Sequence, residues 1–158
     1  MNVSEILKTE AIKYDLCSDW TNDWGTPSLE ELVDKYIKGL DFCILNNYPS
    51  NEFIKKNFGK IAEGKGVFVD SNVNLLNPKI AILNGSCSGE IVLNNYVSRD
   101  IHVRHDSIVK IIIRDGAIAF IRVYDNAHVV VENESGSRCF VYKKGGRVTI
   151  SGDVLVRG

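Results

Sequence analysis

The residues best suited to chemistry lie in the segment IHVRHDS, which holds His102, Arg104, His105 and Asp106, and at His128 further along the chain. Two imidazoles beside a carboxylate could bind a transition metal or act as an acid–base pair. The histidines lack the H-x-x-x-H spacing of a helical metal site. In a strand, His102 and Arg104 would share the outward, solvated face, and His105 and Asp106 would form a corner. We therefore predict structural roles and assign no catalytic, cofactor-binding or metal-ligating residue.

Four carboxylates form a second candidate group, since Asp115, Asp125, Glu132 and Glu134 recur near one side of successive units of a sequence repeat. Some right-handed β-helices cleave polysaccharides with acidic residues on one face. Asp115 and Asp125, however, stand next to Gly and Asn in pairs typical of turns, where the side chain bonds the local backbone. A carbohydrate-binding or carbohydrate-active β-helix is therefore the alternative prediction rather than the first.

Glycine-rich and basic segments give no stronger signal. GKG at 64–66 and KKGGR at 143–147 lack the G-x-x-x-x-G-K-[ST] pattern and the strand–G-x-G-x-x-G–helix context of phosphate sites, so we expect turns. Residues 1–65 carry eight Lys and Arg against eleven Asp and Glu, and residues 66–158 carry eleven against nine. Neither half has the basic excess that nucleic-acid binding requires, and no nucleic-acid partner is expected.

These residues are embedded in a repeat with a period of ten residues, from about Ala81 to Ile150. An apolar residue opens each of the seven units: Ala81, Ile91, Ile101, Ile111, Ile121, Val131 and Val141. A second apolar residue follows two places later in most units, and a turn pair such as Asp115-Gly116 or Gly145-Gly146 comes after it. Short strands therefore alternate with tight turns.

Two architectures fit this repeat. In a β-solenoid (a single-stranded β-helix), each unit supplies one strand and one corner. In an antiparallel meander or sandwich, Asp115-Gly116 and Gly145-Gly146 would make hairpin turns. The constant spacing favours the solenoid, because stacked coils keep one length whereas meanders vary. An even period also keeps Ile111, Ile113 and their counterparts on the inward face.

The periodicity before residue 65 is helical. Ser4 is placed to cap a first helix, whose pattern breaks at Asp19–Gly25. Ser28 and Glu31 have capping-box spacing and predict the start of a second helix.

A third helix, NEFIKKNFG, is predicted to begin after Ser50 and to stop at Gly59, whereas Gly39 interrupts the apolar pattern of the second. Three short, aromatic-rich helices form too small a core to be very stable alone, and an uncovered solenoid end exposes apolar side chains and unpaired strands. The chain is thus predicted to be α+β, with an α-helical cap at 1–65 and a β-solenoid at 66–158.

The unit YDNAHVVVEN, preceded by DGAIAFIRV, resembles the decapeptide Y-D-N-A-x-V-x-V repeats of bacterial β-solenoid proteins. YIKGLDFCILNNYPSNEFIKKNFG, with the later NPKIAILNGSCSG and VRHDS, further resembles a family of uncharacterised bacterial and prophage-associated proteins that have a helical head and such a tail. The resemblance implies a solenoid fold and an association with phages or mobile elements. It implies no activity and no binding residues.

Composition agrees with a globular protein, because 44% of the residues are hydrophobic and no stretch approaches the roughly 18 apolar residues of a membrane span. The N-terminus lacks the apolar block of a signal peptide, so we expect a cytoplasmic or virion-associated protein without a membrane partner. Four cysteines, Cys17, Cys43, Cys87 and Cys139, are scattered without CxxC spacing and are expected to be buried thiols rather than disulfides.

Taken together, these features predict a non-enzymatic structural or protein-interaction module without a cofactor. It would form a homo-oligomer or bind a protein partner, and the strand edge after Val154–Arg157 suits such pairing.

Overall fold

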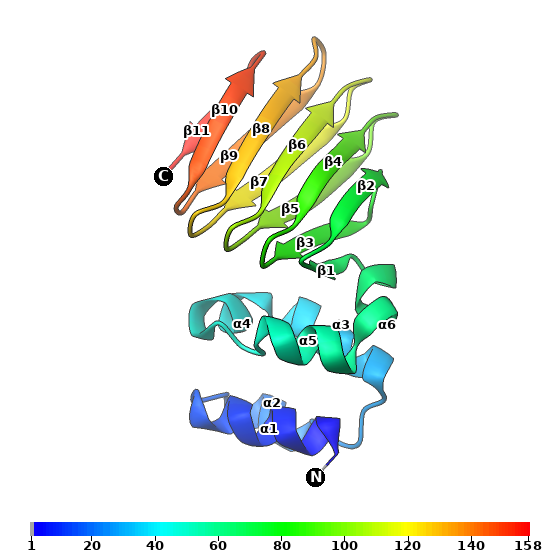
Figure 1. Cartoon of the computed structure of the whole chain (residues 1–158), viewed down its shortest axis with the longest axis vertical. Coiled ribbons are helices and arrows are strands. Elements are labelled where there is room, and N and C mark those ends of the chain that lie inside the picture. Colours follow the sequence, from blue (N-terminus) through cyan, green and yellow to red (C-terminus); the bar gives the residue numbers. More distant parts are fainter. Residues whose placement is uncertain (1) are drawn as a thin grey trace. The chain divides into compact units, whose positions relative to one another are not determined.

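The computed structural model describes residues 2–158 (Figure 1). The chain divides into a first compact unit that ends at Lys65 and a second that runs from Gly66 to Gly158. The first unit is helical and the second is a β-solenoid of parallel strands, as the repeat and the helical periodicity predict. Every helix in the described part of the chain is too short or too polar to cross a bilayer.

Six helices make up the first unit: α1 (Val3–Lys13), α2 (Ser18–Asn22), α3 (Leu29–Lys38), α4 (Leu40–Asn46), α5 (Asn51–Asn57) and α6 (Gly59–Gly64). The sequence pattern predicts only three, because the shortest helices have too few residues to show a period. In particular, α2 overlaps the segment 19–25, where the pattern of the first helix breaks, and the sequence pattern does not predict this helix.

The helix starts follow side-chain capping. Ser28 accepts a hydrogen bond from the Glu31 amide while the Glu31 carboxylate accepts one from the Ser28 amide, which confirms the predicted capping box of α3. Ser50 caps α5 as predicted. The predicted cap of α1 is wrong, because Asn2 accepts from the Glu5 amide at 2.9 Å, whereas Ser4 Oγ accepts from Trp24 Nε1 at 2.9 Å.

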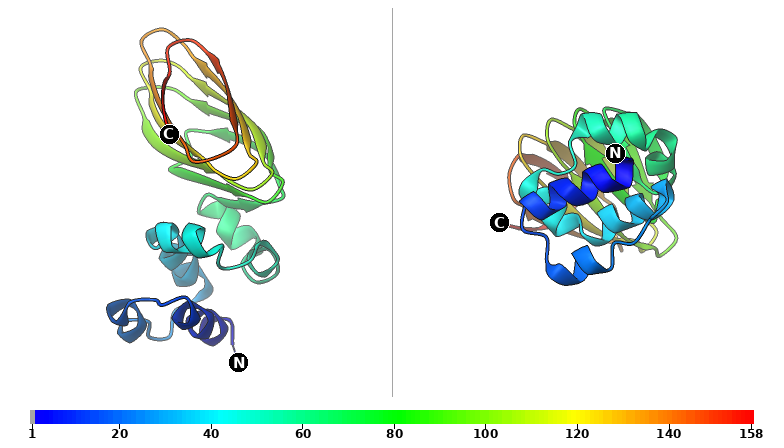
Figure 2. Two further views of the ribbon diagram at one scale, coloured as in Figure 1. Left: turned by 90° about the vertical axis from the view of Figure 1, so that its left-hand side faces the viewer. Right: turned by 90° about the horizontal axis from the view of Figure 1, so that it is seen from below.

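The second unit contains eleven short strands. They are β1 (Val67–Val69), β2 (Asn72–Leu76), β3 (Ile80–Asn84), β4 (Ser88–Leu93), β5 (Ser98–Val103), β6 (Ile108–Ile113), β7 (Ile118–Val123), β8 (His128–Asn133), β9 (Arg138–Lys143), β10 (Arg147–Ser151) and β11 (Leu155–Arg157). All pair in parallel, so the antiparallel meander is excluded. Figure 2 shows the coils of this unit stacked in succession.

Each full coil consists of two repeat units, a number that the ten-residue period leaves open. Odd-numbered strands form one sheet in the order β1-β3-β5-β7-β9-β11, and even-numbered strands form the other, β10-β8-β6-β4-β2. In the middle coils, paired residues lie twenty positions apart, as Ile91 and Ile111 do in one sheet and Ile101 and Ile121 in the other. Residues separated by ten positions therefore lie in different sheets.

The space between the two sheets is filled by the predicted apolar positions. Ile91, Ile111 and Val131 stack in one sheet and face Ala81, Ile101, Ile121 and Val141 in the other, all with 0% of their surface exposed. The inward placement of Ile111 and Ile113 is thus confirmed. Complete burial of an aliphatic side chain stabilises the fold by about 1.5–3 kcal/mol, so these columns are the main source of stability in the solenoid.

Candidate functional site

The histidines are dispersed over the solenoid. His102 lies on β5, and contrary to the prediction of a solvated side chain it is 7% exposed. Its ring stacks on Tyr124, with 6.2 Å between centroids and 9° between planes, and Nδ1 lies 3.3 Å from the Tyr124 hydroxyl. The two residues lie in neighbouring coils. The ten-residue period does not predict this contact, because it does not give the number of units in a coil.

Arg104 is also buried, at 4% exposure, where the sequence predicts a solvated side chain. Its Nη1 donates a 2.7 Å hydrogen bond to Oδ1 of Asn84, which is itself fully buried. A buried guanidinium needs acceptors, and the asparagine one coil earlier supplies one. This contact holds the corner between β5 and β6 and gives Arg104 a structural role.

His105 occupies the next corner position and links three coils. Its Nδ1 accepts a 2.8 Å hydrogen bond from the Gly85 amide, and its own amide donates one of 3.0 Å to Asp125 Oδ2. Burial, and then the positive charge of Arg104, lower the pKa of His105 below its usual range. A neutral imidazole is needed here, because a protonated Nδ1 could not accept the Gly85 amide.

His128 lies apart from the other two histidines, at the start of β8 in the other sheet. Its Nε2 is 2.9 Å from Thr149 Oγ1, and its Nδ1 is 3.3 Å from Arg147 Nη2. Asp106 accepts a long 3.5 Å contact from Asn126 at an exposed corner. Within residues 2–158, no group of three or more His, Cys, Asp or Glu side chains is arranged to hold a metal ion.

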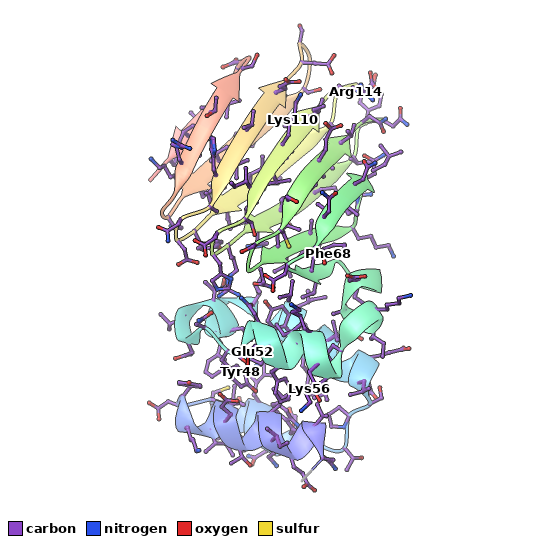
Figure 3. All side chains as sticks on the ribbon, viewed as in Figure 1. Tyr48, Glu52, Lys56, Phe68, Lys110 and Arg114 are labelled. Atoms are coloured by element: carbon purple, nitrogen blue, oxygen red, sulfur yellow. The ribbon has the colours of Figure 1, made fainter. Side chains whose placement is uncertain are left out.

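The four carboxylates do not share one side, so that expectation is wrong. Asp115 lies at the corner between β6 and β7, whereas Asp125 lies between β7 and β8 at the opposite edge of the two sheets. Arg114, at the same corner as Asp115, and Lys110 on β6 are labelled in Figure 3. The separation follows from the two repeat units in each coil, which send alternate corners to opposite edges.

The other two carboxylates occupy different places. Glu132 points outward from β8 and forms a 3.1 Å ion pair with Lys110, whereas Glu134 is exposed at the corner after β8, on the same edge as Asp115. The four carboxylates are thus divided between two opposite edges and one outer sheet face.

The outer face of the odd-numbered sheet carries an aromatic and arginine ladder that the sequence reading missed. Phe120 stacks on Phe140 with centroids 5.4 Å apart and 12° between planes. Arg122 lies 5.1 Å from the ring centroid of Tyr142 and forms a 3.1 Å ion pair with Asp100. Phe120 and Phe140, like Arg122 and Tyr142, are twenty residues apart in the sequence. This spacing indicates a contact only when the length of one coil is known.

Phe120 and Phe140 each turn one ring face toward the other across adjacent strands. The Tyr142 ring faces Arg122 in the same way. Stacking of this kind contributes about 0.5–1.5 kcal/mol beyond area burial and accounts for the ladder as a stabilising feature.

The last coil, which we define as residues 143–158 with β10 and β11, differs from the rest of the solenoid. Each of its strands stands at the end of its sheet and has one neighbour among the described strands. Ile150, Leu155 and Val156 are 43%, 46% and 40% exposed, whereas Val67 and Val73 in the first coil are 1% and 3% exposed. The last coil therefore combines exposed apolar side chains with strands that stand at the ends of their sheets.

Basic side chains surround this open coil. Lys143, Lys144 and Arg147 of the segment KKGGR are all exposed, and so is Arg157 on β11. Gly146 has a φ of +73°, and a Cβ there would meet the Ala127 carbonyl oxygen at 2.2 Å. The glycines of KKGGR are thus explained by close packing of one coil on the next rather than by a phosphate site.

The helical unit contains an apolar cavity of about 400 Å³. Leu7, Trp20, Trp24, Leu32, Tyr36 and Tyr48 are among the residues that line it. Tyr48, labelled in Figure 3, donates a 2.6 Å hydrogen bond to the Leu7 carbonyl, and burial raises its pKa. Its hydroxyl therefore serves packing and is unsuited to acid–base chemistry.

All four cysteines are free thiols. Cys43, Cys87 and Cys139 are buried and Cys17 is exposed. Burial raises the pKa of the Cys139 thiol to about 12, so this side chain acts as a small apolar residue between the sheets.

No family model matches this chain, and neither does a curated protein or a solved structure.

Proposed function

We propose that this protein is a non-enzymatic interaction module whose solenoid presents its last coil to another protein. The observation that carries the proposal is the exposure of Ile150, Leu155 and Val156 on strands that have one neighbour each among the described strands. An uncovered strand edge offers backbone donors and acceptors to a further strand, and exposed aliphatic side chains beside it supply apolar surface. Both favour protein as the ligand.

The remaining chemistry supports an absence of enzymatic function. His105, Arg104 and Asp125 each take part in a contact between coils that explains its presence. Phe120 and Phe140 stack on each other, and this contact explains their recurrence without a sugar ligand. These two observations favour the interaction module over a carbohydrate-binding or carbohydrate-active protein.

The proposal is tested by Ile150→Lys combined with Val156→Lys, compared with the wild type by size-exclusion chromatography with light scattering. Two added charges at the open coil should abolish concentration-dependent association, because each would have to be buried in the complex. Ile108→Lys is the matched control, since Ile108 is 57% exposed on the outer face of β6. It should associate as the wild type does.

A monomeric wild-type protein that binds members of a glycan array at the Phe120–Phe140 face would overturn the proposal in favour of the carbohydrate alternative. Equal association of the double variant and the wild type would also contradict it.

We further propose an association with phages or mobile elements, supported by the resemblance of YIKGLDFCILNNYPSNEFIKKNFG, NPKIAILNGSCSG and VRHDS to a bacterial and prophage-associated family. Genomic position tests this part. Neighbouring virion or mobile-element genes are the expected result, and neighbouring sugar-degradation genes would contradict it.

A further inference from the structure

We infer that the last coil binds the helical unit of a second copy of this chain, so that copies join head to tail. This inference rests on the proposed function, since it names the partner of the same open coil. The evidence for it is that two exposed surfaces of the chain have opposite charge: the last coil is basic and one surface of the helical unit is acidic.

The last coil is strongly basic. Residues 143–158 contain Lys143, Lys144, Arg147 and Arg157, against Asp153 as the single acidic residue. All five side chains are exposed. A partner surface must therefore offer carboxylates as well as an apolar area that can cover Ile150, Leu155 and Val156.

The helical unit offers both properties. Residues 14–34 contain six Asp and Glu and no Lys or Arg. Four carboxylates, from Asp19, Asp23, Glu31 and Asp34, line a depression of about 440 Å³ together with Trp20, Lys35 and Lys38. We call this depression the acidic groove.

The lysines only partly offset these carboxylates. Lys35 lies over the rings of Trp20 and Trp24, at 5.6 and 5.4 Å from their centroids, and Lys65 forms a 2.9 Å ion pair with Asp34. Asp19 and Asp23 stay exposed on and beside α2. They are the carboxylates best placed to meet a basic partner.

Apolar surface adjoins the acidic groove. Trp20, Lys35 and Lys38 line both the groove and the apolar cavity of about 400 Å³. A strand that carries both apolar and basic side chains, as β11 does with Leu155, Val156 and Arg157, matches this combination. The two surfaces are complementary in both polarity and charge.

The charge also selects between two modes of self-association. A two-fold contact between last coils would bring two basic surfaces together, and like charges at an interface oppose binding. A head-to-tail contact pairs the basic coil with the acidic groove. Because it is heterologous, it leaves one free surface of each kind and extends into longer assemblies.

A charge-swap experiment on the full chain tests the inference. One variant carries Lys143→Glu and Arg157→Glu, and the other carries Asp19→Lys and Asp23→Lys. Sedimentation equilibrium is measured at low salt for the wild type, each variant alone and their equimolar mixture. Far-UV circular dichroism verifies that both variants are folded.

The wild type should form species larger than a dimer at low salt and lose them in 0.5 M salt, where screening is strong. Each variant alone should be monomeric, since both of its surfaces then have one sign. The equimolar mixture should regain association, because each reversed surface meets an opposite one.

Three outcomes overturn the inference. They are a wild type that stays monomeric at low salt, a mixture that stays monomeric, and a pairing of the coil-reversed variant with the wild type in closed dimers. The last result would indicate contact between last coils and would leave the proposed function standing. The proposed function is judged separately, by the comparison of Ile150→Lys/Val156→Lys with Ile108→Lys.

Discussion

His105 illustrates how a residue suited to catalysis acquires a structural role in a solenoid. Its backbone has a φ of +56°, a left-handed conformation that occurs at the corner, and its ring accepts the amide of the coil before it. Asp125 repeats the arrangement one coil later by accepting the His105 amide. This corner position thus favours a residue whose side chain holds a hydrogen-bond acceptor close to the backbone.

This contact makes stability depend on pH. The pKa of His105 is lowered in the folded state, so the unfolded chain binds more protons between that value and about 6.5. The stabilisation is therefore complete above pH 6.5 and is lost as pH falls through the folded-state pKa. Urea midpoints of the wild type should fall over this window more steeply than those of His105→Asn.

Asparagine is the appropriate replacement, because it tolerates a positive φ and keeps an acceptor that does not titrate. His102 and His128 remain in both proteins, so their contributions cancel in the comparison. Identical pH profiles for the two proteins would show that the Gly85–His105 contact contributes no pH-dependent stability.

At the scale of the strand, burial separates residues that look alike in the sequence. Ile111 and Ile108 both lie on β6, but Ile111 is fully buried between the sheets and Ile108 is 57% exposed. Ile111→Asp should destabilise the protein by about 4 kcal/mol or more, because it buries an unpaired charge. Ile108→Asp should change stability by roughly 0.5 kcal/mol or less.

Chemical denaturation followed by far-UV circular dichroism measures both substitutions. Since domains of this size are stable by about 5–15 kcal/mol, a loss of about 4 kcal/mol removes roughly a quarter to four fifths of the stability and should clearly lower the denaturation midpoint of Ile111→Asp. Comparable midpoints for the two variants would contradict the inward assignment of Ile111.

Individual strands could be predicted from the sequence, whereas their partners could not. The even period identifies which residues of Ile111–Ile113 face inward, because alternate residues of a strand point to opposite faces. A ten-residue period does not reveal that one coil contains two units. A prediction from this period therefore places Asp115 and Asp125 on one side and does not include the contact between Phe120 and Phe140. Burial of His102 was missed for the same reason, since Tyr124 lies one whole coil away.

At the scale of the whole molecule, the two units differ in how they are stabilised. The solenoid has continuous columns such as Ile101–Ile121–Val141, whereas the helical unit relies on six short helices around an apolar cavity. Short helices have little stability of their own and depend on tertiary packing. The predicted capping role of residues 1–65 is tested by comparing the intact chain with a truncated chain.

Deletion of residues 1–60 tests that role. If the helices protect apolar side chains and strand edges of the solenoid, the truncated chain should aggregate, because such surfaces pair with other chains. Soluble yield and light scattering measure the effect. A monodisperse, cooperatively unfolding fragment would contradict the capping role and would establish the solenoid as an independent domain.

The twenty-residue coil also constrains how the length of this protein can change during evolution. Gain or loss of ten residues preserves inward and outward positions but moves every later strand to the opposite sheet, so a change between Phe120 and Phe140, or between His105 and Asp125, separates that pair. Gain or loss of twenty residues keeps all these pairs in place. Homologous chains should therefore differ in length by whole coils, and duplication of this unit offers a simple route by which the solenoid lengthened.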